Sequence, residues 1–398
     1  MQTNLIKAVL PYFAASLIIL LAGCGGGGDS NPQAGDSSLS VLLTDAPAGG
    51  FAAVNVTINK VRVHQSSSAS GNDPGWADIT LNPARKINLL NLTNGVLEDL
   101  GQTSLPAGHY TQLRLELAAN SGTNFANSVV LASDPNREIA LDTPSAVQSG
   151  IKLVNEFDVA PGQHVDLVLD FDALKSVVTH GNGTYSLKPV IKVVPTELNG
   201  IEGFVDTAIL GDDIRVSAQT NGKVICSTTP NPQTGEFFLA RLAPGNYDVV
   251  LTGKGRATAV IAGVPVATTV STTIVSTSIS RITLPISTTK NASGTVTLNP
   301  PSTTEVAYVA AKQVFGGGPT VTVADKAVDP GTGGYVLTLP VSAPLLGQFG
   351  TGTLPIALSA QAAVAGKYIL EASAEGYTTQ QVSRDVSAGV IQDFILVP

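Results

Sequence analysis

The sequence predicts an all-β protein made of tandem β-sandwich domains. Runs of alternating apolar and polar residues are separated at short intervals by Gly, Pro and Asn, which is typical of sandwich strands and their turns. Charged residues make up 13% of the chain, about half the usual ~25%. Hydrophobic residues make up 43%, which is enough to build packed cores and is unlike a disordered chain.

The first 23 residues resemble the export signal of a bacterial lipoprotein. A short, weakly positive start precedes an apolar run from Ala8 to Leu20. This run is shorter than the about 20 apolar residues that a membrane-spanning helix needs. Leu21-Ala22-Gly23-Cys24 resembles a lipobox, which implies cleavage before Cys24 and lipid on its thiol and amine. A signal for ordinary soluble secretion is the alternative interpretation.

Residues 24–38 are predicted to form a flexible tether that begins at the lipidated Cys24. The stretch is rich in Gly and Ser and would reach about 20 Å as a random coil. Two or more acyl chains hold a protein on a bilayer stably, so we expect the membrane to be the first partner. The residue after the cysteine is Gly25 rather than Asp. In a Gram-negative host this implies delivery to the outer membrane or the cell surface.

Residues 39–195 are predicted to form a first β-sandwich. Alternation is clear in 53–58, 110–117 and 165–171, and we expect one short helix around 92–100. Six stretches follow one another in order along this unit: Leu43–Pro47, Ile87–Leu90, Leu105–Tyr110, Ser149–Leu153, Leu169–Ala173 and Lys188–Ile191. With these stretches the unit resembles the DUF4382 family of bacterial and archaeal surface proteins, which implies a transthyretin-like or related β-sandwich and no assigned activity.

Residues 199–285 and 290–398 are predicted to be two copies of another sandwich. Gly235 to Tyr247 carries the pattern GxFxLxxLxPGxY, and Gly334 to Tyr368 repeats it with an insertion from Pro340 to Ala363. Both copies resemble carboxypeptidase regulatory-like domains of the transthyretin type. The second copy is the more divergent because of its insertion.

The candidate site with the most ionisable side chains lies on one predicted strand, His164 to Asp172. Side chains alternate along a strand, so His164, Asp166, Asp170 and Asp172 share one face while Val165, Leu167, Leu169 and Phe171 enter the core. Carboxylate oxygens are the ligands that Ca²⁺ prefers. Neighbours on one face are about 6.5–7 Å apart, so one ion would need further ligands from loops. The simpler interpretation is a solvated polar face.

Asp45 is a second candidate residue, in Thr44-Asp45-Ala46-Pro47. An Asp before a turn usually bonds to nearby backbone, and this structural role is the simpler one. Asp45 would join the Asp170 and Asp172 group if both lie at one end of the sandwich.

Cys226 and Trp76 are interpreted as structural residues. If Cys24 carries lipid, Cys226 has no partner for a disulfide within the chain, since only two Cys occur. The simplest interpretation of Cys226 is then a small apolar residue buried in a core. Trp76 is the only Trp, and we expect its large ring in the core of the first sandwich.

No reaction is indicated by the sequence. The chain has no G-x-S-x-G elbow, and its four His have no paired metal-ligand spacing. Net charge is −8 without a basic cluster, which argues against nucleic-acid binding. We therefore expect no enzyme and no cofactor, but a non-catalytic envelope protein for binding, spacing or adhesion. Its partners would be a surface polysaccharide or an envelope protein. The alternatives are a calcium- or carbohydrate-binding module, and a hydrolase with its site spread over several loops.

The lipid assignment predicts that Cys24→Ser releases the protein from membranes and abolishes incorporation of labelled palmitate. The matched control is Cys226→Ser, which removes the other thiol and should leave both properties unchanged. Labelling and membrane fractionation of both variants provide the test. An N-terminal peptide that retains Met1, or that carries a bare Cys24 thiol in mass spectrometry, would contradict the assignment.

Overall fold

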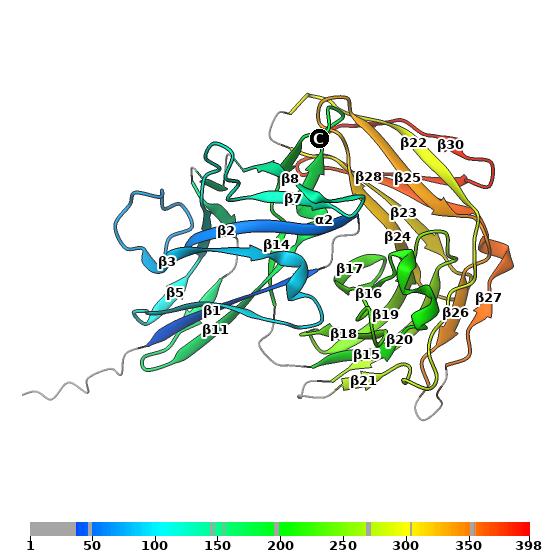
Figure 1. The fold of residues 1–398 in the computed structure, drawn as a ribbon, viewed down its shortest axis with the longest axis horizontal. Coiled ribbons are helices and arrows are strands. Elements are labelled where there is room, and N and C mark those ends of the chain that lie inside the picture. The colour runs from blue at the N-terminus through cyan, green and yellow to red at the C-terminus, as the bar shows by residue number, and fades with distance from the viewer. Residues whose placement is uncertain are drawn as a thin grey trace, which may run out of the picture. The chain divides into compact units, whose positions relative to one another are not determined.

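Nearly all regular structure in this protein is β-strand, which confirms the predicted fold class (Figure 1). The computed structural model describes residues 37–46, 50–143, 146–147, 149–153, 156–194, 199–267, 272–302, 305–350, 354 and 356–398. The predicted signal peptide, Cys24 and the predicted tether up to residue 36 lie outside this range. We call the described parts of 37–194, 199–285 and 286–398 the first, second and third sandwich.

The first sandwich is organised by β11 (His164–Asp172), which pairs in parallel with β1 (Ser38–Ala46). One sheet has the order β14-β11-β1-β4, and the other has the order β12-β13-β8-β7-β2-β6-β9 with β3 on β2. The remaining elements are β2 (Phe51–His64), β3 (Ala77–Asn88), η1 (Leu89–Leu92), β4 (Glu98–Ser104), β5 (Gly108–Tyr110), β6 (Gln112–Leu117), β7 (Ser128–Leu131), β8 (Asp134–Asp142), β9 (Ile151–Leu153), β10 (Phe157–Val159), α2 (Ala173–Ser176), β12 (Val177–Thr179), β13 (Tyr185–Leu187) and β14 (Ile191–Val194).

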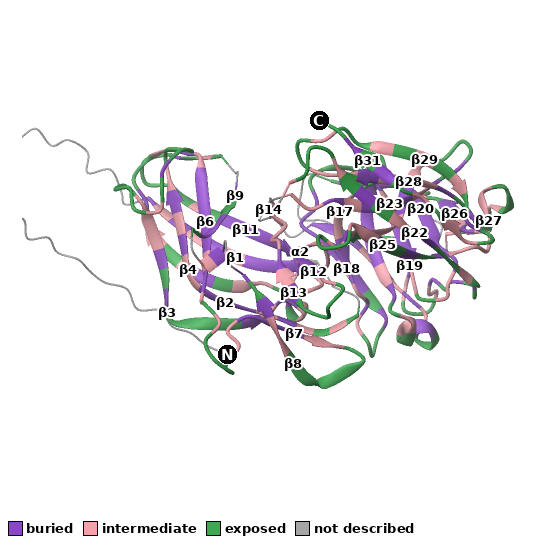
Figure 2. Ribbon diagram, turned by 90° about the horizontal axis from the view of Figure 1, so that it is seen from above, coloured by how far each residue is buried: buried purple, intermediate pink, exposed green. Residues whose placement is uncertain are grey.

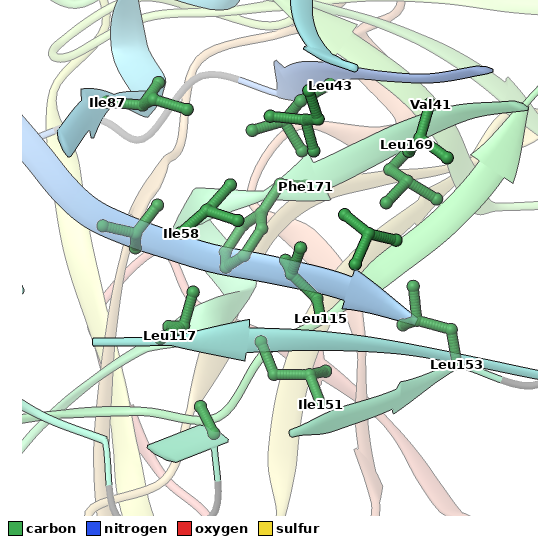
Figure 3. Close-up of a cluster of buried hydrophobic side chains, with 14 of the residues drawn as sticks. Val41, Leu43, Ile58, Ile87, Leu115, Leu117, Ile151, Leu153, Leu169 and Phe171 are labelled. Carbon is green, nitrogen blue, oxygen red and sulfur yellow. The ribbon is translucent and has the colours of Figure 1, made fainter. Parts of the chain in front are cut away.

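The core of the first sandwich lies between these two sheets. Leu169 and Phe171 of β11 are fully buried, as the alternation predicted, and meet Ile58 and Leu115 from the opposite sheet (Figure 3). Figure 2 shows the buried stretches of β1 and β11. The expected helix at 92–100 is wrong. A 3-10 turn ends at Leu92, and β4 begins at Glu98.

Trp76 is not in this core, contrary to our expectation. Its half-buried ring lies on the outer side of the sheet, 4.8 Å from the guanidinium carbon of Arg62 and 5.0 Å from that of Arg114. The indole Nε1 donates to the carbonyl of Ser70 at 2.9 Å. Two cation–π contacts and one hydrogen bond therefore hold the ring, and they stabilise the polar loop that precedes it.

The second and third sandwiches have the same strand order. In each, the first strand pairs antiparallel with the fourth and parallel with a late strand. The other sheet has four antiparallel strands in corresponding order, β17-β16-β19-β20 in the second sandwich and β24-β23-β28-β29 in the third. Their shared family assignment stays a prediction. The elements of the second are β15 (Gly200–Phe204), η2 (Thr207–Asp212), β16 (Arg215–Thr220), β17 (Lys223–Thr228), β18 (Glu236–Ala240), β19 (Gly245–Thr252), β20 (Ala259–Val266) and β21 (Thr272–Ile274). Those of the third are β22 (Thr289–Leu298), β23 (Tyr308–Val314), β24 (Thr320–Ala327), β25 (Gly334–Pro340), β26 (Leu345–Gln348), β27 (Ser359–Ala360), η3 (Ala362–Val364), β28 (Lys367–Ser373), β29 (Gln380–Asp385), β30 (Val390–Ile391) and β31 (Phe394–Leu396).

A tyrosine hydroxyl closes the turn before the same strand in both repeats. Tyr247 donates to the carbonyl of Ala243 at 2.6 Å, four residues back. Tyr368 donates to the carbonyl of Pro340 at 2.7 Å, although the insertion separates the two residues by 28 positions. The hydroxyl therefore fixes the two ends of the insertion at the position where the second sandwich has a tight turn.

The insertion does not pack on the third sandwich alone. Its strand β26 pairs in parallel with β20, and β27 continues that sheet, so the second sandwich is extended by strands that come from beyond its own sequence range (Figure 1). Leu345, Phe349 and Leu358 pack against the second core. The edge of β20 thereby gains backbone partners that an exposed edge would lack.

Cys226 lies in β17, where its half-buried side chain packs against the second core as predicted. Burial raises the pKa of its thiol, and the nearby carboxylate of Asp170 adds to this. Among the described residues Cys226 is the free cysteine. A thiol with a raised pKa is a poor nucleophile, which agrees with a structural role.

We predict that Gly347→Val weakens the second sandwich by about 1–3 kcal/mol, the usual cost of overpacking. A Cβ at Gly347 would lie 2.7 Å from the carbonyl oxygen of Ala357 and 2.8 Å from the side chain of Leu358. The matched control is Gly350→Val in the same insertion, because no atom lies within 4 Å of a Cβ there. Thermal unfolding and protease cleavage within 341–361 provide the measurement. Equal effects of both substitutions would contradict the packing of β26.

Candidate functional site

The predicted site residues fall into two separate sets along β11. His164 and Asp166 stand at its start, where His164 pairs with Ser38 of β1. Asp170 and Asp172 stand at its end, where they pair with Thr44 and Ala46. Four residues of strand separate Asp166 from Asp170 by about 13 Å. Among the described residues, no group of three or more His, Cys, Asp or Glu is placed to hold a metal ion.

The first set forms an exposed chain of polar contacts. His164 Nδ1 lies 2.7 Å from Ser38 Oγ, and His164 Nε2 lies 2.9 Å from Asp166 Oδ1. This is the order of groups in a Ser-His-Asp hydrolase site. However, the side chains of His164 and Asp166 are 48% and 43% exposed, and neither cavity described below includes them. Water therefore screens these contacts.

The second set is buried, and Asp45 belongs to it. Asp45 Oδ1 accepts a 3.0 Å hydrogen bond from the backbone N–H of Ala173, the first residue of α2. Asp45 Oδ1 thus bonds to a backbone group that lies 128 positions away in the sequence. Since β1 and β11 run in parallel, their last residues lie at the same end of the sheet. Asp45 pairs there with Phe171, the residue between Asp170 and Asp172, and this brings Asp45 beside both.

Asp170 is buried, so the interpretation of a solvated polar face is wrong at this end of β11. Only 8% of the residue is exposed, and it lines a small cavity together with Ile225, Cys226 and Ala240 of the second sandwich. Burial raises the pKa of Asp170 to about 6, and repulsion from Asp172 adds to this while Lys192 opposes it. Val168, on the same face, is also fully buried.

Asp172 caps the short helix α2. Its Oδ1 accepts from the backbone N–H of Lys175 at 3.1 Å, and its Oδ2 lies 3.8 Å from Lys175 Nζ. Burial raises the pKa of this carboxyl, while Lys175 opposes the rise. Asp172 therefore faces the other sandwiches from the end of β11 as part of a charged cluster.

The remaining members of this cluster come from distant sequence and were not predicted. Lys175 Nζ lies 3.2 Å from Asp325 Oδ2 of β24, and Tyr308 of β23 donates to the carbonyl of Lys175 at 3.4 Å. Burial, with help from Asp172 and Asp325, raises the pKa of Tyr308 to about 12. Burial lowers the pKa of Arg215 in β16, although the same carboxylates oppose this. No sequence pattern relates residues 150 positions apart, so this cluster had no local signal.

A cavity of about 740 Å³ opens beside this cluster, between all three sandwiches. Its walls include Phe51 and Lys175 from the first, Arg215 and Thr252 from the second, and Asp325 from the third. We call this region the junction. Its volume lies within the about 300–1,000 Å³ of ordinary small-molecule sites.

Asn94 bridges the first and second sandwiches at the junction. Its backbone N–H donates to Thr228 Oγ1 at 3.1 Å, and its Nδ2 donates to the carbonyl of Thr229 at 3.0 Å. Its Oδ1 accepts from Thr228 Oγ1 at 2.7 Å and from the N–H of Phe238 at 3.2 Å. Asn94 has the left-handed backbone that Asn tolerates, with φ 58°.

Gln219 bridges the second and third sandwiches in the same way. It is only 1% exposed. Its Oε1 accepts from the backbone N–H of Thr322 at 2.7 Å, and its Nε2 donates to the Thr322 carbonyl at 2.8 Å. Between the first and third sandwiches, the N–H of Gly181 donates to Asp329 Oδ2 at 2.7 Å. Each pair of sandwiches is thus joined by specific hydrogen bonds.

Comparison with known proteins identifies one domain. Residues 36–189 match the model "Domain of unknown function (DUF4382)", so the predicted DUF4382 domain is confirmed for the first sandwich. A search of curated proteins gave no match. Among the described residues, no helix is long and apolar enough to cross a membrane.

Solved structures give only weak similarity. The Bacillus anthracis TIE protein is 12% identical with a TM-score of 0.17, over 91% of this chain and 50% of that one, so this chain spans half of that protein. A streptococcal ancillary pilin is 9% identical with a TM-score of 0.16, over 91% and 99%. The Corynebacterium diphtheriae major pilin SpaA is 12% identical with a TM-score of 0.20, over 90% and 100%. We draw nothing from similarities this low.

The buried Asp170 predicts a pH-dependent stability. Its folded-state pKa of about 6 lies above the ordinary 3.8, so folding favours the protonated form. The free energy of unfolding should therefore fall as pH rises from about 4 to 6, by about 3 kcal/mol at most. Asp170→Asn should reduce this slope, leaving the part that the buried Asp172 contributes, and should be more stable than the natural chain at pH 7.

The matched control is Asp166→Asn on the same strand and face, where the side chain is exposed. Urea unfolding between pH 4 and 7.5 measures the slope for both variants. An unchanged slope in Asp170→Asn would show that another group causes it.

Proposed function

We propose that this protein is a non-catalytic, lipid-anchored cell-envelope protein whose three sandwiches act as one rigid module for spacing or binding at the surface. The observation that carries this proposal is the set of hydrogen bonds that joins every pair of sandwiches. Domains that are linked in one chain usually move relative to each other unless their interface is extensive. Here the interface includes a shared sheet, since β26 pairs with β20.

Rigidity suits a spacer because a stiff module keeps its far end at a fixed distance from its attachment. The proposed attachment is Cys24 with its short tether, both outside the described residues. The proposed partners are a surface polysaccharide or an envelope protein. In a Gram-negative host the proposed location is the outer membrane or the cell surface. Protease treatment of intact and of permeabilised cells distinguishes external display from a periplasmic position.

The rigid module predicts that the second and third sandwiches unfold together and that Gln219→Met separates them. Met keeps the volume but leaves the N–H and the carbonyl of Thr322 without the Gln219 amide. Each buried group left unsatisfied costs about 1–3 kcal/mol, so the coupling should weaken by about 2–6 kcal/mol for the two groups. Calorimetry should show one transition in the natural chain and two in the variant.

Gln102→Met is the matched control, because Gln102 lies exposed on β4 of the first sandwich. It should keep the single transition. If the natural chain itself unfolds in independent steps, the sandwiches are not one rigid unit and the proposed spacing role loses its support.

A further inference from the structure

The junction cavity has no part in a purely mechanical spacer, although it is large enough for a ligand. We propose that it binds a neutral carbohydrate of about two or three sugar units. Its about 740 Å³ is ample for such a ligand on the usual scale of binding sites. This proposal concerns the described residues alone and does not depend on lipid attachment.

Charge pairing in the cavity walls argues for a neutral ligand. Lys175 lies 3.2 Å from Asp325, and Arg256 Nη2 lies 2.7 Å from Asp212 Oδ2. The lining also holds Asp213 and Lys254, which are exposed and of opposite sign. It further holds Arg215, which lies near the carboxylates of Asp325 and Asp172. A charged ligand would therefore find charges of both signs rather than a surplus of one. A neutral polyhydroxylated ligand instead accepts from the cations and donates to the carboxylates while the pairs persist, since each charged group has several hydrogen-bonding positions.

Hydroxyl and apolar side chains complete the match to a sugar. Hydroxyl groups line the cavity from all three sandwiches, including Thr93, Thr252 and Thr289. Apolar side chains of Phe51, Leu90 and Leu174 line the part that belongs to the first sandwich. A pyranose ring has a polar rim and less polar faces, so a wall with both kinds of group suits it. A predominantly apolar ligand would offer these hydroxyl groups no hydrogen-bond partner.

The cavity is formed before a ligand arrives. Its walls are held by Asn94 between the first and second sandwiches and by Gln219 between the second and third. Walls that need no ordering lower the free-energy cost of binding. The same contacts that make the module rigid would therefore favour affinity at the junction.

Titration calorimetry with maltotriose, cellotriose and triacetylchitotriose tests the proposal on the purified protein. We expect saturable binding of at least one neutral trisaccharide below about 10 mM, a range typical of weak small-ligand sites. Thr252→Trp and Thr289→Trp place bulk on two different walls, and each should weaken binding at least tenfold. Thr80→Trp, at an exposed position of β3 outside the cavity, is the matched control and should bind normally.

Hydrogen exchange on the unmutated protein gives a readout that does not depend on variant folding. The bound sugar should slow exchange in 252–256 and 322–325, which line the cavity. Absence of binding by all three sugars would overturn the proposal, as would binding that both Trp variants retain or protection confined to other segments. Trigalacturonate is the anionic probe, and its binding in place of the neutral sugars would show that the ligand class is wrong.

Discussion

The need to satisfy backbone groups at strand edges holds the three sandwiches together. The edge of β20 receives β26 from the insertion of the third sandwich. The edge of β24 receives no strand from the second sandwich, but the Gln219 side chain takes both backbone groups of Thr322. An amide side chain offers the same donor and acceptor as a peptide unit. The buried Gln219 thus satisfies backbone groups at the edge of β24, as strand β26 does at the edge of β20.

Burial of these edges brings charged groups together that would otherwise be solvated. Lys175 and Asp325 come from different sandwiches, and their side chains are 25% and 17% exposed. Leaving either one alone at this depth would cost more than the pair gains. The pair therefore favours the assembled arrangement over one in which a single sandwich is displaced. It also supplies the polar wall of the junction cavity.

Local patterns predicted which side chains of a strand enter the core of its own sandwich. They did not predict which of its other side chains a second sandwich buries. Alternation along β11 correctly placed Leu169 and Phe171 in the core, because the opposite sheet is part of the same sandwich. The same alternation suggested a solvated face at Asp170, which the second sandwich buries. Trp76 was misplaced for a related reason, since no pattern indicated that Arg62 and Arg114 would hold the ring outside the core.

The insertion is the clearest case of a feature that sequence could locate but not interpret. Comparison of the two repeats placed it between Pro340 and Ala363, and the Tyr368 hydroxyl bonds at that base. Where its strands pair depends on β20, some 80 residues earlier. The same dependence applies to Asp170, which lines a cavity together with Ile225, Cys226 and Ala240 of the second sandwich. We therefore expect the first sandwich without the two that follow to expose this Asp more and to lower its pKa, while repulsion from Asp172 would persist.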